Sequence, residues 1–215
     1  MKTQVWAHRG ASAYAPENTL EAFRLAAEMG ADGVELDVQL SRDGELVVAH
    51  DETIDRVSSG TGYIKDYTLA QLKKLSFNRL FPNFKDARIP TLKEVYELLK
   101  PAGLTVNVEL KTGIILYPEI EEKVLALTAS MGMEDRVIYS SFCHPSLVRL
   151  KELDSGLKTG LLYSDGWIGA ADYGRRTVGA DALHPALYHM QDPDLIPAAR
   201  RQGLAVNVWT CLLYT

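Results

Sequence analysis

Short apolar runs typical of β-strands alternate with helical patterns along the whole chain, and this alternation limits the folds that the chain can adopt. Parallel neighbouring strands need a crossover connection, usually a helix, so a strand–helix–strand rhythm favours a parallel sheet or a barrel. We therefore predict an α/β fold. The strand-like runs cover residues 4–8, 33–38, 104–110, 136–140, 159–163, 181–184 and 204–209.

Helix-start signals separate these runs. Asn18 is placed to cap a helix that ends at Gly30, and residues 91–94 (TLKE) and 68–71 (TLAQ) have the spacing of capping boxes. Residues 51–90 interrupt the rhythm with polar turns and irregular segments. We interpret this stretch as an insertion at the rim of the sheet, where loops commonly carry function.

Composition narrows the class of protein. With 215 residues, of which 47% are hydrophobic, the chain can bury one large core, so we predict a single domain. The net charge is −5 and the basic residues are scattered, which argues against nucleic acid as a partner. We recognise neither a signal peptide nor a membrane-spanning run, so we expect a cytoplasmic protein. Cys143 and Cys211 have no metal-site spacing, and we interpret both as incidental.

A predicted hairpin brings the first acidic pair close to a histidine. Residues 33–41 alternate in polarity with a period of two, so Glu35 and Asp37 share one face of a strand. Asp43 and Gly44 match a two-residue type I′ turn. If they form the loop, Asp37 lies opposite His50 on the returning strand, at a Cβ distance of roughly 5 Å.

Polar side chains also stand at the ends of other predicted strands. In a parallel barrel the carboxyl ends of all strands open on one face, where such enzymes assemble their sites. Carboxylates without a Cys/His ligand spacing favour a hard cation, Mg²⁺ or Ca²⁺, over zinc. The residues so placed are His8, Glu35, Asp37, Glu109, Lys111 and Trp209.

These residue types suit phosphodiester cleavage. A cation on Glu35, Asp37 and Glu109 would polarise a phosphoryl group, while Arg9 and Lys111 neutralise its remaining charge. Cleavage also needs a base for the nucleophile and an acid for the leaving alkoxide, and imidazoles titrate near neutral pH. His8 and His50 can supply that pair, with Asp37 or Asp51 orienting His50. The sequence does not decide which histidine is the acid.

Each residue also has a structural explanation. Paired acids on a strand often form a solvated face, and Glu109 and Lys111 could be a simple ion pair. Trp209 could be core packing. The remaining polar candidates are interpreted as structural or surface groups, or as caps: His144, His184, His189, Glu17 and Asn18. What favours an enzyme is the joint placement at strand ends of six residues: His8, Glu35, Asp37, Glu109, Lys111 and Trp209.

The motifs, taken in order, resemble the glycerophosphodiester phosphodiesterase family. They are residues 8–10 (HRG), 16–19 (PENT), 35–38 (ELDV), 50–51 (HD), 108–111 (VELK) and 208–210 (VWT). The resemblance implies a TIM (β/α)₈-type barrel with a small insertion after strand two. It also implies metal-dependent hydrolysis of glycerophosphodiesters to sn-glycerol 3-phosphate and an alcohol, a step of glycerophospholipid catabolism.

The resemblance also assigns roles. It implies metal ligation by Glu35, Asp37 and Glu109, and acid/base catalysis by His8 and His50. Substrate contacts are assigned to Arg9, Lys111, Phe142 and Trp209, the last two in the glycerol pocket. The chain departs from the family pattern after Phe142, and residues 211–215 do not resemble it. We therefore expect a barrel truncated before strand eight, with a non-native tail at 211–215, that is unstable or prone to aggregate.

Two other functions stay open, as does the oligomeric state. A phosphodiesterase of the lysophospholipase D kind would need an apolar platform, for which the insertion offers Tyr63, Phe77, Leu80, Phe81 and Phe84. A non-catalytic phosphoester-binding barrel would retain only the ion site. The presence of both His8 and His50 favours an enzyme over that alternative.

Overall fold

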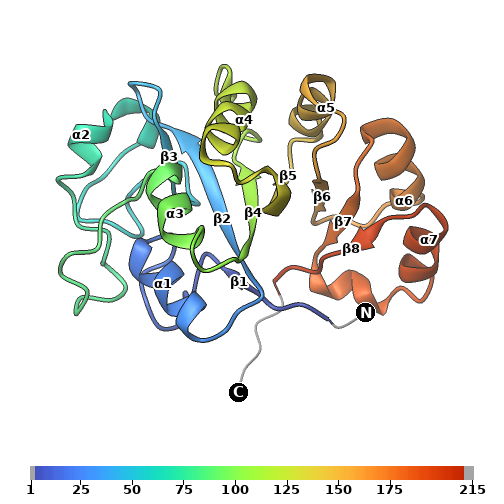
Figure 1. Cartoon of the computed structure of the whole chain (residues 1–215), viewed down its shortest axis with the longest axis horizontal. Coiled ribbons are helices and arrows are strands. Elements are labelled where there is room, and N and C mark those ends of the chain that lie inside the picture. Colours follow the sequence, from blue (N-terminus) through green and yellow to red (C-terminus); the bar gives the residue numbers. More distant parts are fainter. Residues whose placement is uncertain (1–2, 211–215) are drawn as a thin grey trace. The chain divides into compact units, whose positions relative to one another are not determined.

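The computed structural model describes residues 3–210, in which strands and helices alternate along the chain as predicted (Figure 1). They fall into two compact units, Met1–Val137 (the N-terminal unit) and Ile138–Thr215 (the C-terminal unit). The single domain expected from the sequence stays a prediction. None of the helices formed by the described residues is both long and apolar enough to span a membrane.

The N-terminal unit is built on a parallel sheet with β2 in the middle. Its strands are β1 (Trp6–His8), β2 (Gly33–Leu40) and β4 (Thr105–Leu110), and β3 (Leu46–Val48) pairs antiparallel with β2. In this register His8 lies opposite Glu35, and Asp37 lies opposite Glu109. The pairing therefore places polar side chains of three neighbouring strands side by side.

The helices of this unit begin largely where the sequence indicates. They are α1 (Leu20–Glu28), α3 (Leu92–Leu99) and α4 (Ile120–Met131), and the capping box at the start of α3 is confirmed. The cap of α1 was predicted wrongly. Thr19 accepts from the Ala22 N–H, whereas Asn18 has a φ of 55° and turns its amide to the acidic cluster. Both types can cap a helix, and the nearby carboxylate of Asp37 decides between them.

The β2–β3 hairpin has a different register from the predicted one. The Ala49 N–H donates to the Asp37 carbonyl at 3.0 Å, so Asp37 is paired with Ala49 and not with His50. The loop holds three residues, because Gly44 has a φ of 80° after a turn closed onto the Ser41 carbonyl. Asp43 accepts from Ser41 Oγ and from the Leu69 N–H. Those contacts favour a three-residue loop with a left-handed glycine over the type I′ turn.

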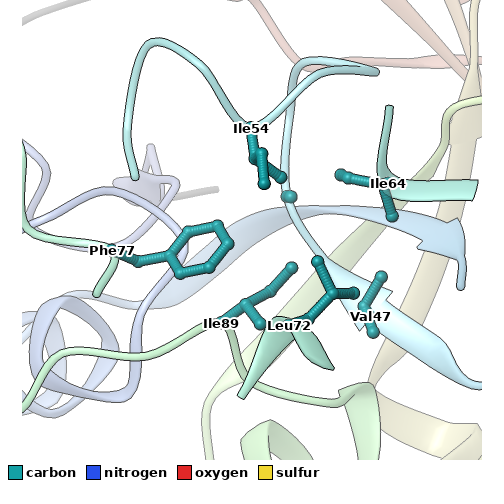
Figure 2. Close-up of a cluster of buried hydrophobic side chains, with 7 residues drawn as sticks. Val47, Ile54, Ile64, Leu72, Phe77 and Ile89 are labelled. Carbon is teal, nitrogen blue, oxygen red and sulfur yellow. The ribbon is translucent and has the colours of Figure 1, made fainter. Parts of the chain in front are cut away.

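Residues 51–90 form an excursion with its own small core. It contains the 3₁₀ turn η1 (Ile64–Asp66) and the short helix α2 (Leu69–Leu72), which begins at the predicted capping box. Its buried apolar side chains pack against Val47 of β3 and against Ala49 (Figure 2); they are Ile54, Ile64, Leu72, Phe77 and Ile89. This cluster anchors the segment that carries His50 and Asp51.

The C-terminal unit continues the alternation. Its parallel strands are β5 (Val137–Ser141), β6 (Thr159–Tyr163), β7 (Ala182–Pro185) and β8 (Ala205–Val206). They alternate with α5 (His144–Leu153), α6 (Ala170–Asp172), a π-helical turn (Tyr173–Val178), a 3₁₀ turn (Leu187–Gln191) and α7 (Leu195–Arg201). The predicted tail at 211–215 lies outside the described residues.

Candidate active site

Three carboxylates converge in the N-terminal unit. Glu35 and Asp37 lie two apart on β2, and Glu109 lies opposite Asp37 on β4. Each offers an oxygen that lies within 4.8 Å of the other two. Asp37 is fully buried and Glu109 nearly so. The structure therefore brings together all three residues predicted to bind a metal ion.

The electrostatics of this cluster suit a cation. Burial, followed by the charges of Asp37 and Glu109, raises the pKa of Glu35 well above its ordinary value. Burial and the charge of Asp37 raise the pKa of Glu109 to about 7, against the opposing charge of Lys111. Asp37 Oδ1 is buried and has no hydrogen-bond partner among the described residues. An oxygen-rich, electron-rich set with an unpartnered carboxylate oxygen fits Mg²⁺ or Ca²⁺.

Positive and amide groups border the cluster. Asn18 donates to Asp37 Oδ2 at 2.8 Å, and Arg9 Nε lies 3.6 Å from the same oxygen. Lys111 Nζ donates to Glu109 Oε1 at 3.0 Å and lies 3.9 Å from Asp37 Oδ1. Burial alone would lower the pKa of Lys111, but the charges of Glu109 and Asp37 raise it. Lys111 is therefore a fixed cation beside the carboxylates.

The turn after β1 fixes the position of Arg9. Arg9 has a left-handed φ of 57°, and its N–H lies 3.0 Å from the Glu35 carbonyl and 3.1 Å from Glu35 Oε2. Gly10 follows with a φ of 78°, and a Cβ there would lie 2.7 Å from the backbone carbon of Ala22 in α1. Strained backbone of this kind persists where the surroundings hold it, often at functional sites.

The two predicted acid/base histidines lie on different elements of the same unit. His8 ends β1, with Nε2 3.8 Å from Glu35 Oε2. Burial, then the charge of Arg9, lowers the pKa of His8 to about 4, so His8 is neutral at pH 7; the charge of His50 contributes in the same direction. His50 follows β3, and its Nδ1 lies 2.6 Å from Asp51 Oδ1. Asp51 therefore orients His50, which is one of the two alternatives that the sequence left open.

An ion-pair chain behind His50 was not predicted. Arg56 bridges the carboxylates of Asp51 and Glu17, and Glu17 also accepts from Arg9 Nη1 at 3.1 Å. Burial favours a higher pKa for Asp51, but hydrogen bonds from Arg56 and His50 outweigh it and lower that pKa to about 2. Glu17 was interpreted as a cap or loop-fixing group, and its place in the PENT segment was the sequence signal for more.

A buried glutamine holds the backbone beside His50. The amide nitrogen of Gln39 donates to the carbonyl oxygens of Ala49, His50 and Asp51 at 2.9, 3.2 and 2.7 Å. Its amide oxygen accepts from the Tyr117 hydroxyl at 2.8 Å. Its place two residues after Asp37, on the same face of the strand as Glu35 and Asp37, was the signal that sequence reasoning passed over.

The two aromatic residues assigned to the substrate lie in the C-terminal unit. The rings of Phe142 and Trp209 meet edge to face with centroids 5.3 Å apart. Phe142 is 41% exposed, and Trp209 Nε1 donates to the His184 carbonyl at 2.7 Å. His184 is buried, which lowers its pKa to about 4. These residues contact one another, and their role toward a substrate stays a prediction.

Comparisons with known proteins match this chain to one family over nearly its whole length. The model of the glycerophosphoryl diester phosphodiesterase family matches residues 8–214. A glycerophosphodiester phosphodiesterase of Caldanaerobacter subterraneus subsp. tengcongensis is 47% identical over 211 residues, covering 98% of this chain and 86% of the relative.

Solved structures give the same result. A crystal structure of glycerophosphodiester phosphodiesterase from Agrobacterium tumefaciens has a TM-score of 0.85 and 32% identity, over 96% of this chain and 86% of that one. An Oleispira antarctica phosphodiesterase in complex with the product sn-glycerol-3-phosphate has a TM-score of 0.84 and 30% identity, over 97% of this chain and 85% of that one. The likeness confirms the predicted α/β class.

Proposed function

The chain belongs to the glycerophosphoryl diester phosphodiesterase family, and from this premise we propose that it is an enzyme that hydrolyses glycerophosphodiesters to sn-glycerol 3-phosphate and an alcohol. The observation that carries the proposal is the convergence of Glu35, Asp37 and Glu109 beside Arg9 and His8. The product named for the Oleispira antarctica relative supports the glycerol 3-phosphate half of the substrate.

The cofactor is a divalent cation, Mg²⁺ or Ca²⁺, held by Glu35, Asp37 and Glu109. When bound, it would polarise the phosphoryl group as a Lewis acid. It would also relieve the repulsion among the three carboxylates, which the raised pKa values of Glu35 and Glu109 express. Arg9 and Lys111, which border the cluster, would then donate to phosphate oxygens, which arginine and lysine bind well.

The two histidines exchange the protons that the reaction requires. His8 is neutral at pH 7 and accepts the proton of the attacking oxygen as that oxygen bonds to phosphorus. Asp51 is ionised and can only accept, so Nδ1 of His50 carries a proton and Nε2 is left to act. The bond from phosphorus to the alcohol oxygen breaks as His50, in its doubly protonated form, donates its Nε2 proton to that oxygen, while Nδ1–H stays bonded to Asp51. Phe142 and Trp209 contact the glycerol moiety in this proposal.

A panel of glycerophosphodiesters assayed with Mg²⁺, with Ca²⁺ and with chelator tests the function. His8→Ala and His50→Ala should each lower kcat about 10²- to 10⁴-fold, the usual contribution of acid/base catalysis. His189→Ala, which alters a histidine in a ring cluster of the C-terminal unit, is the matched control. Binding without turnover in any metal would instead support the non-catalytic module, and activity near wild type in either variant would refute the histidine roles.

A lysophospholipid substrate is the second candidate. Ile114 and Leu116, shortly after Lys111, are 76% and 78% exposed and offer an apolar surface. Phe77, which we predicted to lie on an apolar platform of the insertion, is instead buried in the core of the 51–90 excursion. Turnover of glycerophosphocholine against lysophosphatidylcholine separates the two candidates. The cytoplasmic location expected from the sequence stays a prediction.

A further inference from the structure

One guanidinium group is shared between two carboxylates at the edge of the site. Arg56 Nε donates to Asp51 Oδ2 at 2.7 Å, and Nη2 donates to Asp51 Oδ1 at 3.2 Å. Nη1 and Nη2 donate to Glu17 Oε2 and Oε1, both at 2.7 Å. All three donor nitrogens of the planar guanidinium are therefore committed to protein carboxylates.

Each of those carboxylates also holds a residue of the proposed site. Asp51 Oδ1 lies 2.6 Å from Nδ1 of His50, the proposed proton donor. Glu17 Oε1 accepts from Nη1 of Arg9 at 3.1 Å, the proposed phosphate contact. Arg56 thus joins the proton-transfer residue to the phosphate-binding residue, although it comes from the excursion after β3 and touches neither of them.

Stability alone does not account for this arrangement. The Arg56 side chain is 41% exposed, and ion pairs at exposed positions typically contribute little to stability. Nor does the chain of charges line a ligand pocket, because the cavity beside Glu17, His50 and Arg56 has a volume of about 10 Å³. That is room for at most about one water molecule.

The geometry requires arginine in particular. A guanidinium presents a rigid fork that meets two carboxylates at once, whereas a lysine ammonium is a point charge on a flexible stem. With Asp51 clamped from one side, its remaining acceptor capacity faces Nδ1 of His50. With Glu17 clamped likewise, Arg9 keeps a fixed direction toward the acidic cluster.

We propose that Arg56 is a positioning residue that fixes the tautomer of His50 through Asp51 and the orientation of Arg9 through Glu17. The kinetic part of this proposal rests on the proposed phosphodiesterase activity. The tautomer part does not, because it concerns a hydrogen bond within the metal-free protein.

Arg56→Ala and Arg56→Lys test the proposal, with Arg79→Ala as the matched control. Arg79 also anchors the excursion, by donating to the Asp55 carbonyl, but it contacts neither Asp51 nor Glu17 in the structure. The first readout is the ¹⁵N spectrum of the His50 imidazole, assigned with His50→Ala, at a pH where the imidazoles are neutral. Wild type and Arg79→Ala should show a proton on Nδ1, whereas Arg56→Ala should shift the population toward Nε2–H.

The second readout is the division of the kinetic effect between kcat and KM. Removing a residue that holds a site residue through a third side chain typically costs about 10- to 100-fold in activity. We therefore expect a fall of that size in kcat for Arg56→Ala. Arg56→Lys should recover only part of it. Glu17→Gln leaves the bond between His50 and Asp51 intact and should mainly raise KM.

Two results would overturn the proposal: an unchanged His50 tautomer in Arg56→Ala, or equal kinetic losses in Arg56→Ala and Arg79→Ala. If the wild-type protein hydrolyses no glycerophosphodiester, the proposed function fails, and the tautomer measurement still decides the role of Arg56.

Discussion

The strand ends of the two units carry opposite kinds of chemistry. In the N-terminal unit the ends of β1, β2 and β4 hold carboxylates, an arginine, a lysine and a histidine, which pair with one another at 3.0–3.9 Å. In the C-terminal unit the corresponding segments hold rings with centroids 4.6–5.8 Å apart, among them His144, Tyr163, Trp167, Tyr173, Tyr188 and His189.

The difference shows that the two units carry different kinds of side chains at their strand ends. Charged groups need fixed partners, because an unpaired buried charge is costly, and those partners can be exchanged for a cation and a phosphate. Aromatic rings contribute mainly shape and apolar area. We infer that the N-terminal unit supplies the chemistry, and the predictions below test that contrast.

Among the tests of this contrast between the units, the largest expected effect is on Lys111, a cation of the N-terminal unit. Lys111→Met should lower kcat/KM about 10²- to 10³-fold, the range observed when one donor to a developing negative charge is removed. Lys123→Met is the control, because the Lys123 side chain donates to the Gly44 carbonyl and not to the carboxylate cluster. Steady-state kinetics with saturating cation measure the effect, and equal losses in the two variants would contradict the special place of Lys111.

With metal ions removed by a chelator, the protein should become less stable as the pH rises, because of the acidic cluster. The pKa of Glu109 is raised from 4.5 to about 7, so its contribution to stability is present below pH 4.5 and is lost as the pH rises through 7. From about pH 5 to about pH 8 this loss is on the order of 2–3 kcal/mol. Urea unfolding in chelator should show that the free energy of unfolding of the wild type falls with pH. The fall should be smaller in Glu109→Gln. An equal fall in both proteins would argue against the repulsion that we assign to the cluster.

The C-terminal unit should show the opposite dependence through His184. Its pKa is lowered from 6.5 to about 4 by burial, so its contribution is present above pH 6.5 and is lost as the pH falls through 4. Between about pH 7 and about pH 5 we expect a loss of about 2 kcal/mol. Comparing wild type with His184→Asn cancels the similar contribution of His8. If the difference in unfolding free energy between wild type and His184→Asn does not change with pH, burial of His184 is not the cause of the pH dependence.

The smallest expected effect is on the exposed ring of Phe142. Phe142→Leu keeps apolar bulk but removes the edge-to-face contact with Trp209, which is worth about 0.5–1.5 kcal/mol. We expect a rise in KM of up to about 10-fold with little change in kcat, as for a contact made equally in ground and transition states. Tyr188→Leu, another exposed ring of the same unit, is the comparison. A fall in kcat as large as that of Lys111→Met would remove the distinction between the units.

The errors in the sequence-based predictions share one cause. Alternation placed Glu35 and Asp37 on one face of a strand, but the hairpin register depended on contacts from residues far along the chain. Asp43 is held by the Leu69 N–H, and Gln39 holds the backbone at His50, so Asp37 pairs with Ala49. Asn18 donates to Asp37 instead of capping α1 for the same reason. Where a residue has two possible partners, the fold determines which of them lies close enough to pair with it.

The sequence by itself determined the alternation of strands and helices, and it supplied the three candidate oxygen ligands and the two candidate acid/base histidines, because residue type and local periodicity are properties of short segments. Only the tertiary structure decided that Asp51 orients His50, that Gln39 holds its backbone, and that Arg56 links it to Arg9 through Glu17. Glu17 and Arg56 are 39 positions apart, and no local pattern encodes a contact across that separation. Such contacts form only when packing of the 51–90 excursion against β3 closes the intervening chain.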